Sequence, residues 1–289
     1  HRRFAAAHAA APACRCTLLR AARIVPEALA SREARPLLAA LATSPAAAAL
    51  GALGLAFAAF VKGAIGAGFP VIAAPVVASF VDPQTTIIAV SVPGLAMNLL
   101  QISGGDRLVG ILRRHLPFLL VAVASTTIGA LLVRRLDPDV VRFVLGLVTL
   151  GWLALGVFKV SVAITPARER WAAPLLGAVA GVIGGATTIF FPVIAIYLLG
   201  VGVERRHFIQ AISCIFALLQ TIQLGALAVF GAVTGPRLLY ALAVSVPCAL
   251  GFAVGQASQR RLDQVRFMRA VRLLLAATAL QLVYRGLAG

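Results

Sequence analysis

Long apolar runs without a single charged residue are the feature of this sequence that most limits its fold. Such runs extend over 115–133, 171–203, 208–236 and 238–259. A helix needs about 20 apolar residues to cross the hydrocarbon layer of a bilayer, so each run is long enough, or nearly long enough, to span it. A backbone inside lipid must satisfy its own hydrogen bonds, and the runs lack the alternation of a strand. The sequence therefore predicts an all-helical, multi-pass membrane protein whose main partner is the lipid bilayer.

The composition agrees with a membrane chain and disfavours nucleic acid as a partner. Of the 289 residues, 61% are hydrophobic and 12% are charged, yet the formal net charge is +17. Soluble domains average about 45–50% apolar and about 25% charged residues. The basic residues lie almost wholly between the apolar runs. In that position they are typical of anchors facing anionic lipid headgroups, so we expect no nucleic-acid partner.

Two of the expected helices are too short to cross the membrane. We predict helices near 46–62, 69–81, 84–103, 110–133, 139–159, 171–186, 190–203, 206–231, 236–257 and 264–286. At 1.5 Å per residue, the helices at 69–81 and 190–203 reach about 20 Å, which is less than the hydrocarbon thickness of about 30 Å. They are therefore expected to be half-helices or re-entrant segments.

The expected helices form two sequence-related repeats of about four to five helices each, residues 46–160 and 171–289, joined by a linker at 161–170. The matching pairs are Gly63-Ala-Ile-Gly66 with Gly181-Val-Ile-Gly184, Ala89-Val-Ser91 with Ala211-Ile-Ser213, Gln101 with Gln223, and Arg134-Arg-Leu-Asp137 with Arg260-Arg-Leu-Asp263. Their separations of 118, 122 and 126 residues fit a diverged duplication with small insertions. An odd number of crossings per repeat would invert one half relative to the other. Residues 1–45, rich in Arg and Ala, are expected to form an extension outside the fold.

Each repeat is expected to begin with a helix that glycines interrupt. Residues 62–70 read Lys-Gly-Ala-Ile-Gly-Ala-Gly-Phe-Pro, and residues 181–192 read Gly-Val-Ile-Gly-Gly-Ala-Thr-Thr-Ile-Phe-Phe-Pro. Exposed backbone N–H groups at the start of a helix favour an anion. Interruptions at corresponding positions of duplicated halves are typical of secondary transporters, with the substrate site where they meet. The candidate substrate-binding residues are Lys62, Gly63, Gly66, Gly68, Asn98, Gln101, Gly181, Gly184, Gly185, Thr187, Thr188, Gln220 and Gln223.

Each group of candidates also has a purely structural interpretation. Gly177, Gly181 and Gly185 recur every four residues, a spacing that allows helices to pack closely in lipid. Lys62 could extend its ammonium group to the membrane interface. The amides of the third and eighth expected helices could join helices without touching a substrate. These alternatives stay open at the level of sequence.

The placement of acidic side chains indicates an anionic substrate. All nine Asp and Glu residues lie in expected loops or helix ends, whereas cation pumps commonly place carboxylates inside the membrane. The histidines and the four cysteines show no metal-ligand spacing. We therefore expect no metal, no cofactor and no catalytic residue.

The glycine stretch from Phe60 to Pro75, its counterpart from Gly181 to Pro192 and the two-repeat layout together resemble the TauE/SafE sulfite exporter family. The resemblance extends over about 46–286. It implies a multi-pass protein of the bacterial cell inner membrane that transports small anions such as sulfite, sulfonates and related organosulfur compounds.

The leading hypothesis is a transporter or exporter of a small sulfur oxyanion, with a midplane site formed by the two glycine-rich breaks. A non-transporting assembly subunit, an intramembrane enzyme and an ion channel are the alternatives. An intramembrane enzyme would need paired catalytic groups on neighbouring spans, and the sequence offers none. A homo-oligomer stays open.

Overall fold

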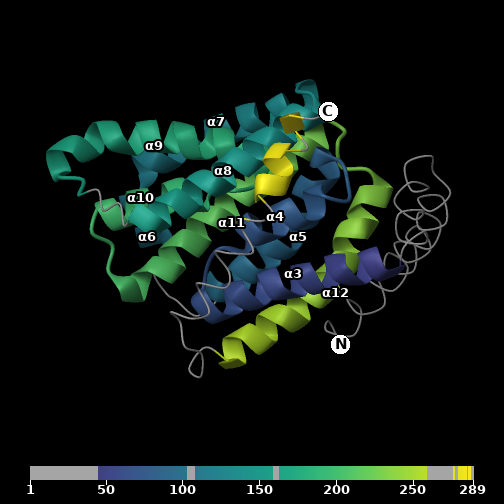
Figure 1. Ribbon diagram of the computed structural model, residues 1–289. Helices are drawn as coiled ribbons and strands as arrows, with labels where there is room; N and C mark the ends of the chain where they lie inside the picture. Colours follow the sequence, from purple (N-terminus) through teal and green to yellow (C-terminus); the bar gives the residue numbers. More distant parts are fainter. Residues whose placement is uncertain are drawn as a thin grey trace, which may run out of the picture.

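The described part of the chain is built from α-helices (Figure 1). The computed structural model describes residues 45–102, 108–158 and 163–258, together with 276, 279–284 and 286–287 near the C-terminus. The helices are α3 (Pro45–Ile65), α4 (Phe69–Ala78), α5 (Pro83–Ile102), α6 (Leu108–Arg114), α7 (Leu116–Arg135), α8 (Pro138–Phe158), α9 (Pro166–Thr187), α10 (Phe191–Gly200), α11 (Arg205–Val229) and α12 (Gly235–Ser258). The prediction of an all-helical fold is confirmed for these residues.

Four helices within the described residues are long and apolar enough to cross a membrane. They extend over Pro83–Ile102, Leu116–Arg135, His207–Val229 and Gly235–Ser258. The two predicted short helices are present as α4 and α10, with 10 residues each. At 1.5 Å per residue each measures about 15 Å, half the hydrocarbon thickness.

Some predicted boundaries were wrong for identifiable reasons. The helix expected at 110–133 is divided at His115 into α6 and α7. Pro117, near the start of α7, has no N–H to donate, and its ring crowds the carbonyl four residues before it. The helix expected at 171–186 begins earlier, with Pro166 at its first position, where a missing N–H costs nothing. Most of the helix expected at 264–286, and residues 1–44, lie outside the described residues.

Glycines bring the backbones of two helix pairs into direct contact, α7 with α9 and α3 with α12 (Figure 1). A Cβ atom added to Gly177 or to Gly181 would lie 2.5 Å from a carbonyl oxygen of α7. A Cβ atom added to Gly251 or Gly255 of α12 would lie 2.0 or 2.2 Å from the carbonyl oxygen of Ala56 or Phe60 in α3. The small-residue spacing seen in the sequence therefore packs helices.

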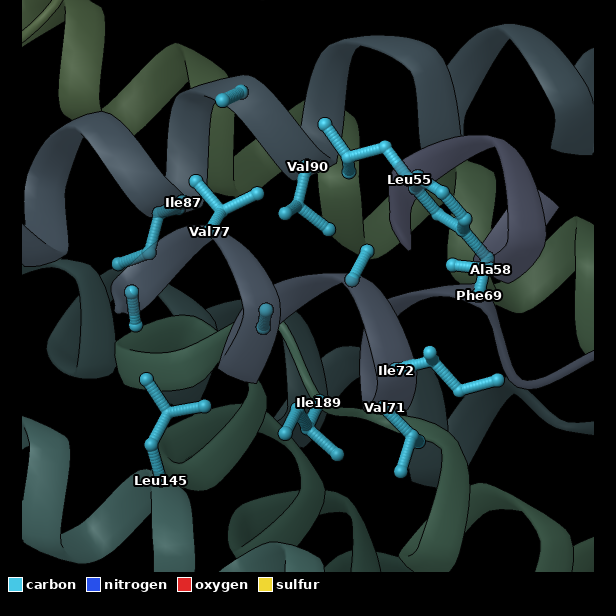
Figure 2. Close-up of a cluster of buried hydrophobic side chains, with 14 of the residues drawn as sticks. Leu55, Ala58, Phe69, Val71, Ile72, Val77, Ile87, Val90, Leu145 and Ile189 are labelled. Atoms are coloured by element: carbon cyan, nitrogen blue, oxygen red, sulfur yellow. The ribbon is translucent and has the colours of Figure 1, made fainter. Parts of the chain in front are cut away.

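The short helix α4 lies at the centre of the apolar core (Figure 2). Nearly all of its residues are buried, because apolar side chains surround its whole circumference. Its Val71, Ile72 and Val77 pack among Leu55 of α3, Ile87 and Val90 of α5, Leu145 of α8 and Ile189 of the α9–α10 connection. This burial keeps the non-helical segment between α3 and α4 inside the protein.

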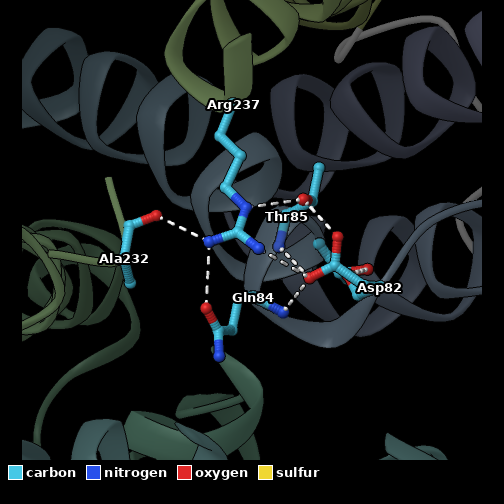
Figure 3. Close-up of polar contacts among 6 residues, drawn as sticks. Asp82, Gln84, Thr85, Ala232 and Arg237 are labelled. Atoms are coloured by element: carbon cyan, nitrogen blue, oxygen red, sulfur yellow. Dashed lines mark hydrogen bonds and ion pairs between the residues drawn. The ribbon is translucent and has the colours of Figure 1, made fainter. Parts of the chain in front are cut away.

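A polar cluster joins the first turns of α5 and α12 (Figure 3). Asp82 accepts hydrogen bonds from the backbone N–H groups of Gln84 and Thr85 at 3.0 Å, which caps α5. The Arg237 guanidinium donates to the side chains of Gln84 and Thr85 and to the carbonyl of Ala232, at 2.9 to 3.1 Å. The cluster fixes where α12 begins relative to α5.

Candidate functional site

Left-handed residues end the long helix at each break. Gly66, after α3, has a φ of 91°, and Thr188, after α9, has a φ of 64°. The Gly66 N–H donates to the Lys62 carbonyl, and the Thr188 N–H donates to the Gly184 carbonyl, both at 2.6 Å. A left-handed residue that closes this bond is a common helix terminus, and glycine adopts the conformation at no steric cost. Among the described residues, Thr188 is the only residue other than glycine with a positive φ.

A chain of three buried side chains lies beside the first break. The Lys62 Nζ donates to the Asn98 Oδ1 at 2.7 Å, and the Asn98 Nδ2 donates to the Gln220 Oε1 at 2.8 Å. The exposed fractions of the three side chains are 4%, 1% and 0%. The interfacial interpretation requires the Lys62 ammonium group to reach the surface, and in the structure this side chain is buried. The Gln220 Nε2 is buried and has no hydrogen-bond partner among the described residues.

The second break is held by Ser91 of α5 and Gln223 of α11. The Ser91 hydroxyl donates to the Gln223 Oε1 and contacts the Thr188 hydroxyl, both at 3.0 Å. The Gln223 Nε2 donates to the carbonyls of Gly184 and Gly185 at 3.0 and 2.9 Å. The amide thus gives the Gly184 carbonyl, which already accepts from Thr188, a second hydrogen bond, and it also pairs the Gly185 carbonyl near the end of α9.

The first break has the same arrangement with the two helices exchanged. The Ser213 hydroxyl of α11 donates to the Gln101 Oε1 of α5 at 2.9 Å. The Gln101 Nε2 donates to the Gly66 carbonyl at 3.1 Å. The two serines were not among the sequence candidates, although the matching Ala-Val-Ser and Ala-Ile-Ser triplets could have identified them.

Most of the sequence candidates meet in this polar region, and a few lie elsewhere. The side-chain hydrogen bonds given above form three groups: Lys62, Asn98 and Gln220; Gly66 and Gln101; and Gly184, Gly185, Thr188 and Gln223. Gly63 and Gly181 instead contact the backbones of α12 and α7. The Thr187 hydroxyl donates within its own helix, to Ile183 at 2.6 Å. Gly68 has a φ of 95°, and the space at its missing Cβ is open.

The described residues offer no group of three or more His, Cys, Asp and Glu side chains that could hold a metal ion. What the region offers is a lysine, several amides and three hydroxyl groups around two broken helices. N–H and O–H donors of this kind pair with an oxyanion.

Comparison with known protein families gives one match, to the family described as Sulfite exporter TauE/SafE, over residues 35–282. Comparison with curated proteins and with solved structures gives no match. The matched stretch contains helices α3 to α12 and both breaks. The chain therefore belongs to the sulfite exporter TauE/SafE family, whose members are multi-pass membrane exporters of sulfur anions and not enzymes.

Proposed function

We propose that this chain exports a small sulfur oxyanion across the bacterial inner membrane, and that the anion binds where the two breaks meet, beside Lys62. The observation that carries the proposal is the buried chain from Lys62 through Asn98 to Gln220. In the described part of the chain, Lys62 is the only buried side chain among Lys, Arg, Asp and Glu. A charged lysine away from water needs an anion to offset its desolvation, and none of the acidic residues that the structure describes contacts Lys62.

The direction of the hydrogen bonds from Lys62 through Asn98 to Gln220 favours an anion at both ends of this series. Each link donates from Lys62 toward Gln220, so the amide oxygens of Asn98 and Gln220 each already accept one hydrogen bond. Donor groups are left over, on the Lys62 Nζ and on the unpaired Gln220 Nε2. A sulfite or sulfonate group carries three oxygens that can accept from such donors.

An inverted repeat would place such a site on a pseudo-two-fold axis, and the contacts between α5 and α11 support this. Ser91 pairs with Gln223, and Gln101 pairs with Ser213. The two helices therefore run antiparallel. Ser91 and Ser213 are 122 residues apart, as are Gln101 and Gln223. Equivalent helices that run antiparallel are what inversion of one half relative to the other produces.

The two breaks support a corrected alignment of the repeats. The glycine motifs suggest that Gly66 corresponds to Gly184, at a separation of 118 residues. The left-handed conformation instead pairs Gly66 with Thr188, at a separation of 122. The same separation relates the Phe-Pro-Val-Ile that begins α4 at Phe69 to the Phe-Pro-Val-Ile that begins α10 at Phe191.

The packing of the long helices suggests how the site would open alternately to the two sides. Under the repeat proposal, the first helix of each half packs against a helix near the end of the other half, α3 against α12 and α9 against α7. Glycine contacts make each pair rigid. Rocking of these two pairs about the polar layer between α5 and α11 would expose Lys62 first to one side and then to the other.

The proposal is tested by flux in liposomes that contain the purified chain. We expect gradient-driven movement of sulfite or of a sulfonate, and at least a tenfold slower flux for Lys62→Gln, because the cation at the site is lost. Arg113→Gln is the matched control, since Arg113 is exposed at the end of α6. No flux of any small sulfur anion would contradict the proposal. If a partner protein then copurified in fixed ratio, the assembly-subunit alternative would replace it.

A further inference from the structure

Lysine is almost absent from this chain, and one of its few occurrences is the buried cation. Of the 26 basic residues, only Lys62 and Lys159 are lysines, and all others are arginines. Lys159 lies outside the described residues. None of the arginine side chains with described exposure is buried. Arginine keeps its charge at every working pH, whereas a lysine that loses contact with water can release its proton.

Among the residues that the structure describes, no fixed negative charge contacts Lys62 to hold that proton. α4 and α5 carry no titratable residue. The titratable residues of α12 are Arg237, Tyr240 and Cys248, and those of α11 are Arg205, Arg206, His207 and Cys214. Arg237 is bound to the start of α5, His207 lies beside Glu204 at the start of α11, and Cys248 contacts the Leu55 carbonyl. The one described side-chain partner of the Lys62 Nζ is the neutral Asn98 amide.

We propose that Lys62 carries a proton together with the exported anion, so that one proton crosses the membrane with each anion. This inference rests on the proposed function. In the empty site Nζ is a neutral amine, which can still donate one N–H to the Asn98 Oδ1. When anion and proton arrive from the same side, the Nζ lone pair binds the proton, and the resulting ammonium pairs with the anion. After the site opens to the other side, the anion leaves, the N–H bond breaks, and the proton follows.

The reason for the coupling is the cost of a lone charge away from water. An ammonium ion without an anion, or an anion without the ammonium ion, would have to be moved through a region where only neutral dipoles surround it. With both present, the two charges offset each other. Transport of a singly charged anion then carries no net charge, and accumulation of the anion inside the cell can drive export.

The test uses proteoliposomes of the full chain, loaded with radiolabelled sulfite and a dye that reports internal pH. We expect the lumen to become alkaline in step with sulfite efflux, and we expect efflux to stay the same when a potassium ionophore imposes a membrane potential. Liposomes without protein measure the leak. Efflux that responds to the potential and leaves the lumen pH unchanged would overturn the inference and leave the exporter proposal intact. Absence of any flux would overturn the exporter proposal itself.

Lys62→Arg separates a proton on the protein from a proton on the substrate. The guanidinium keeps the positive charge but does not release its proton. We expect this variant to keep measurable exchange of external for internal sulfite, faster than that of Lys62→Gln, and its ratio of net efflux to exchange to fall at least tenfold. The retained exchange also shows that the variant is folded. A proton that sulfite brought by itself would survive the substitution, so net, proton-linked efflux by Lys62→Arg would overturn the inference.

Discussion

Thr188 adopts a backbone conformation that β-branched residues seldom take. Its φ of 64° is the only positive φ outside glycine in the described residues. A non-glycine residue held in the left-handed region costs about 1–3 kcal/mol and persists only where its surroundings fix it. Here the fixing contacts are the Ser91 hydroxyl and the amide of Gln223, which binds the two preceding glycine carbonyls. Such strain at a buried polar region is typical of a functional position.

Gly94 tests whether the free donor of Gln220 serves transport. A Cβ atom at residue 94 would lie 2.8 Å from the Gln220 Nε2, so Gly94→Ala must displace that amide. We expect sulfite flux to fall at least about fivefold, a change in transition free energy of about 1 kcal/mol.

The melting temperature of the Gly94→Ala variant in detergent separates a transport effect from misfolding. It should fall by only a few degrees, because a side-chain amide can rotate away more easily than a backbone can move. Gly225→Ala is the control, since residue 225 is exposed on α11 and its Cβ would meet no atom within 4 Å. Equal loss of flux in both variants would contradict a role for the amide.

At the scale of elements, glycine contacts decide which helices move together. The α7–α9 pair and the α3–α12 pair have backbones too close for any side chain between them. Small residues allow such contact in lipid, where van der Waals packing and not the hydrophobic effect brings helices together. These glycines are therefore structural, although one of them, Gly185, also presents its carbonyl to Gln223.

Gly181→Leu should separate α7 from α9 and destabilise the whole chain. The added side chain would meet the Ala122 carbonyl and the Thr126 backbone. Overpacking of this kind typically costs 1–3 kcal/mol or more. The measurement is the yield of monodisperse protein and its melting temperature, with Gly151→Leu as the control, because the Cβ of residue 151 has open space. If both variants melt alike, the close contact of α7 and α9 is wrong.

Arg237 should contribute to stability through its position between α5 and α12. Arg237→Ala removes hydrogen bonds to Gln84, Thr85 and the Ala232 carbonyl. We expect a loss of about 1–3 kcal/mol, since the side chain is 18% exposed and its ion pair with Asp82 is screened by solvent. Thermal unfolding in detergent measures the loss. Arg134→Ala, at an exposed position, should change the melting temperature little.

At the scale of the whole molecule, the antiparallel pairing of α5 and α11 predicts their orientation in the membrane. The connection before α5 and the connection before α11 should lie on opposite sides. In a background without the natural cysteines, a membrane-impermeant thiol reagent should label Phe80→Cys in one vesicle orientation and Glu204→Cys in the other. Labelling of both from the same side would contradict the inverted repeat.

Sequence patterns predicted the helices and the breaks because both depend on local properties. A run without charges is apolar whatever it contacts, and glycine and proline interrupt a helix through their own backbone geometry. The sequence therefore predicted closely where the short helices α4 and α10 lie, and where α5 and α11 begin and end. The division at His115 could also have been predicted, from Pro117.

The candidate site was predicted only in part, because a sequence does not say which faces of two helices meet. Glycine with a positive φ and glycine packed against a neighbouring backbone look identical in sequence, so Gly66 and Gly181 were placed together as candidates. The structure separates them. The partners of Ser91 and Ser213 lie more than 100 residues away.

The sequence by itself determined that the chain lies in a membrane, that it is helical, that two of its helices are broken, and that no carboxylate lies in its apolar runs. These follow from the polarity and backbone preferences of each residue alone. Only the tertiary structure decided that Lys62 meets Asn98 and Gln220, and that each break is closed by an amide of its own half that contacts a serine of the opposite half. A hydrogen bond between distant residues depends on how helices cross, and that is set by the packing of the whole bundle.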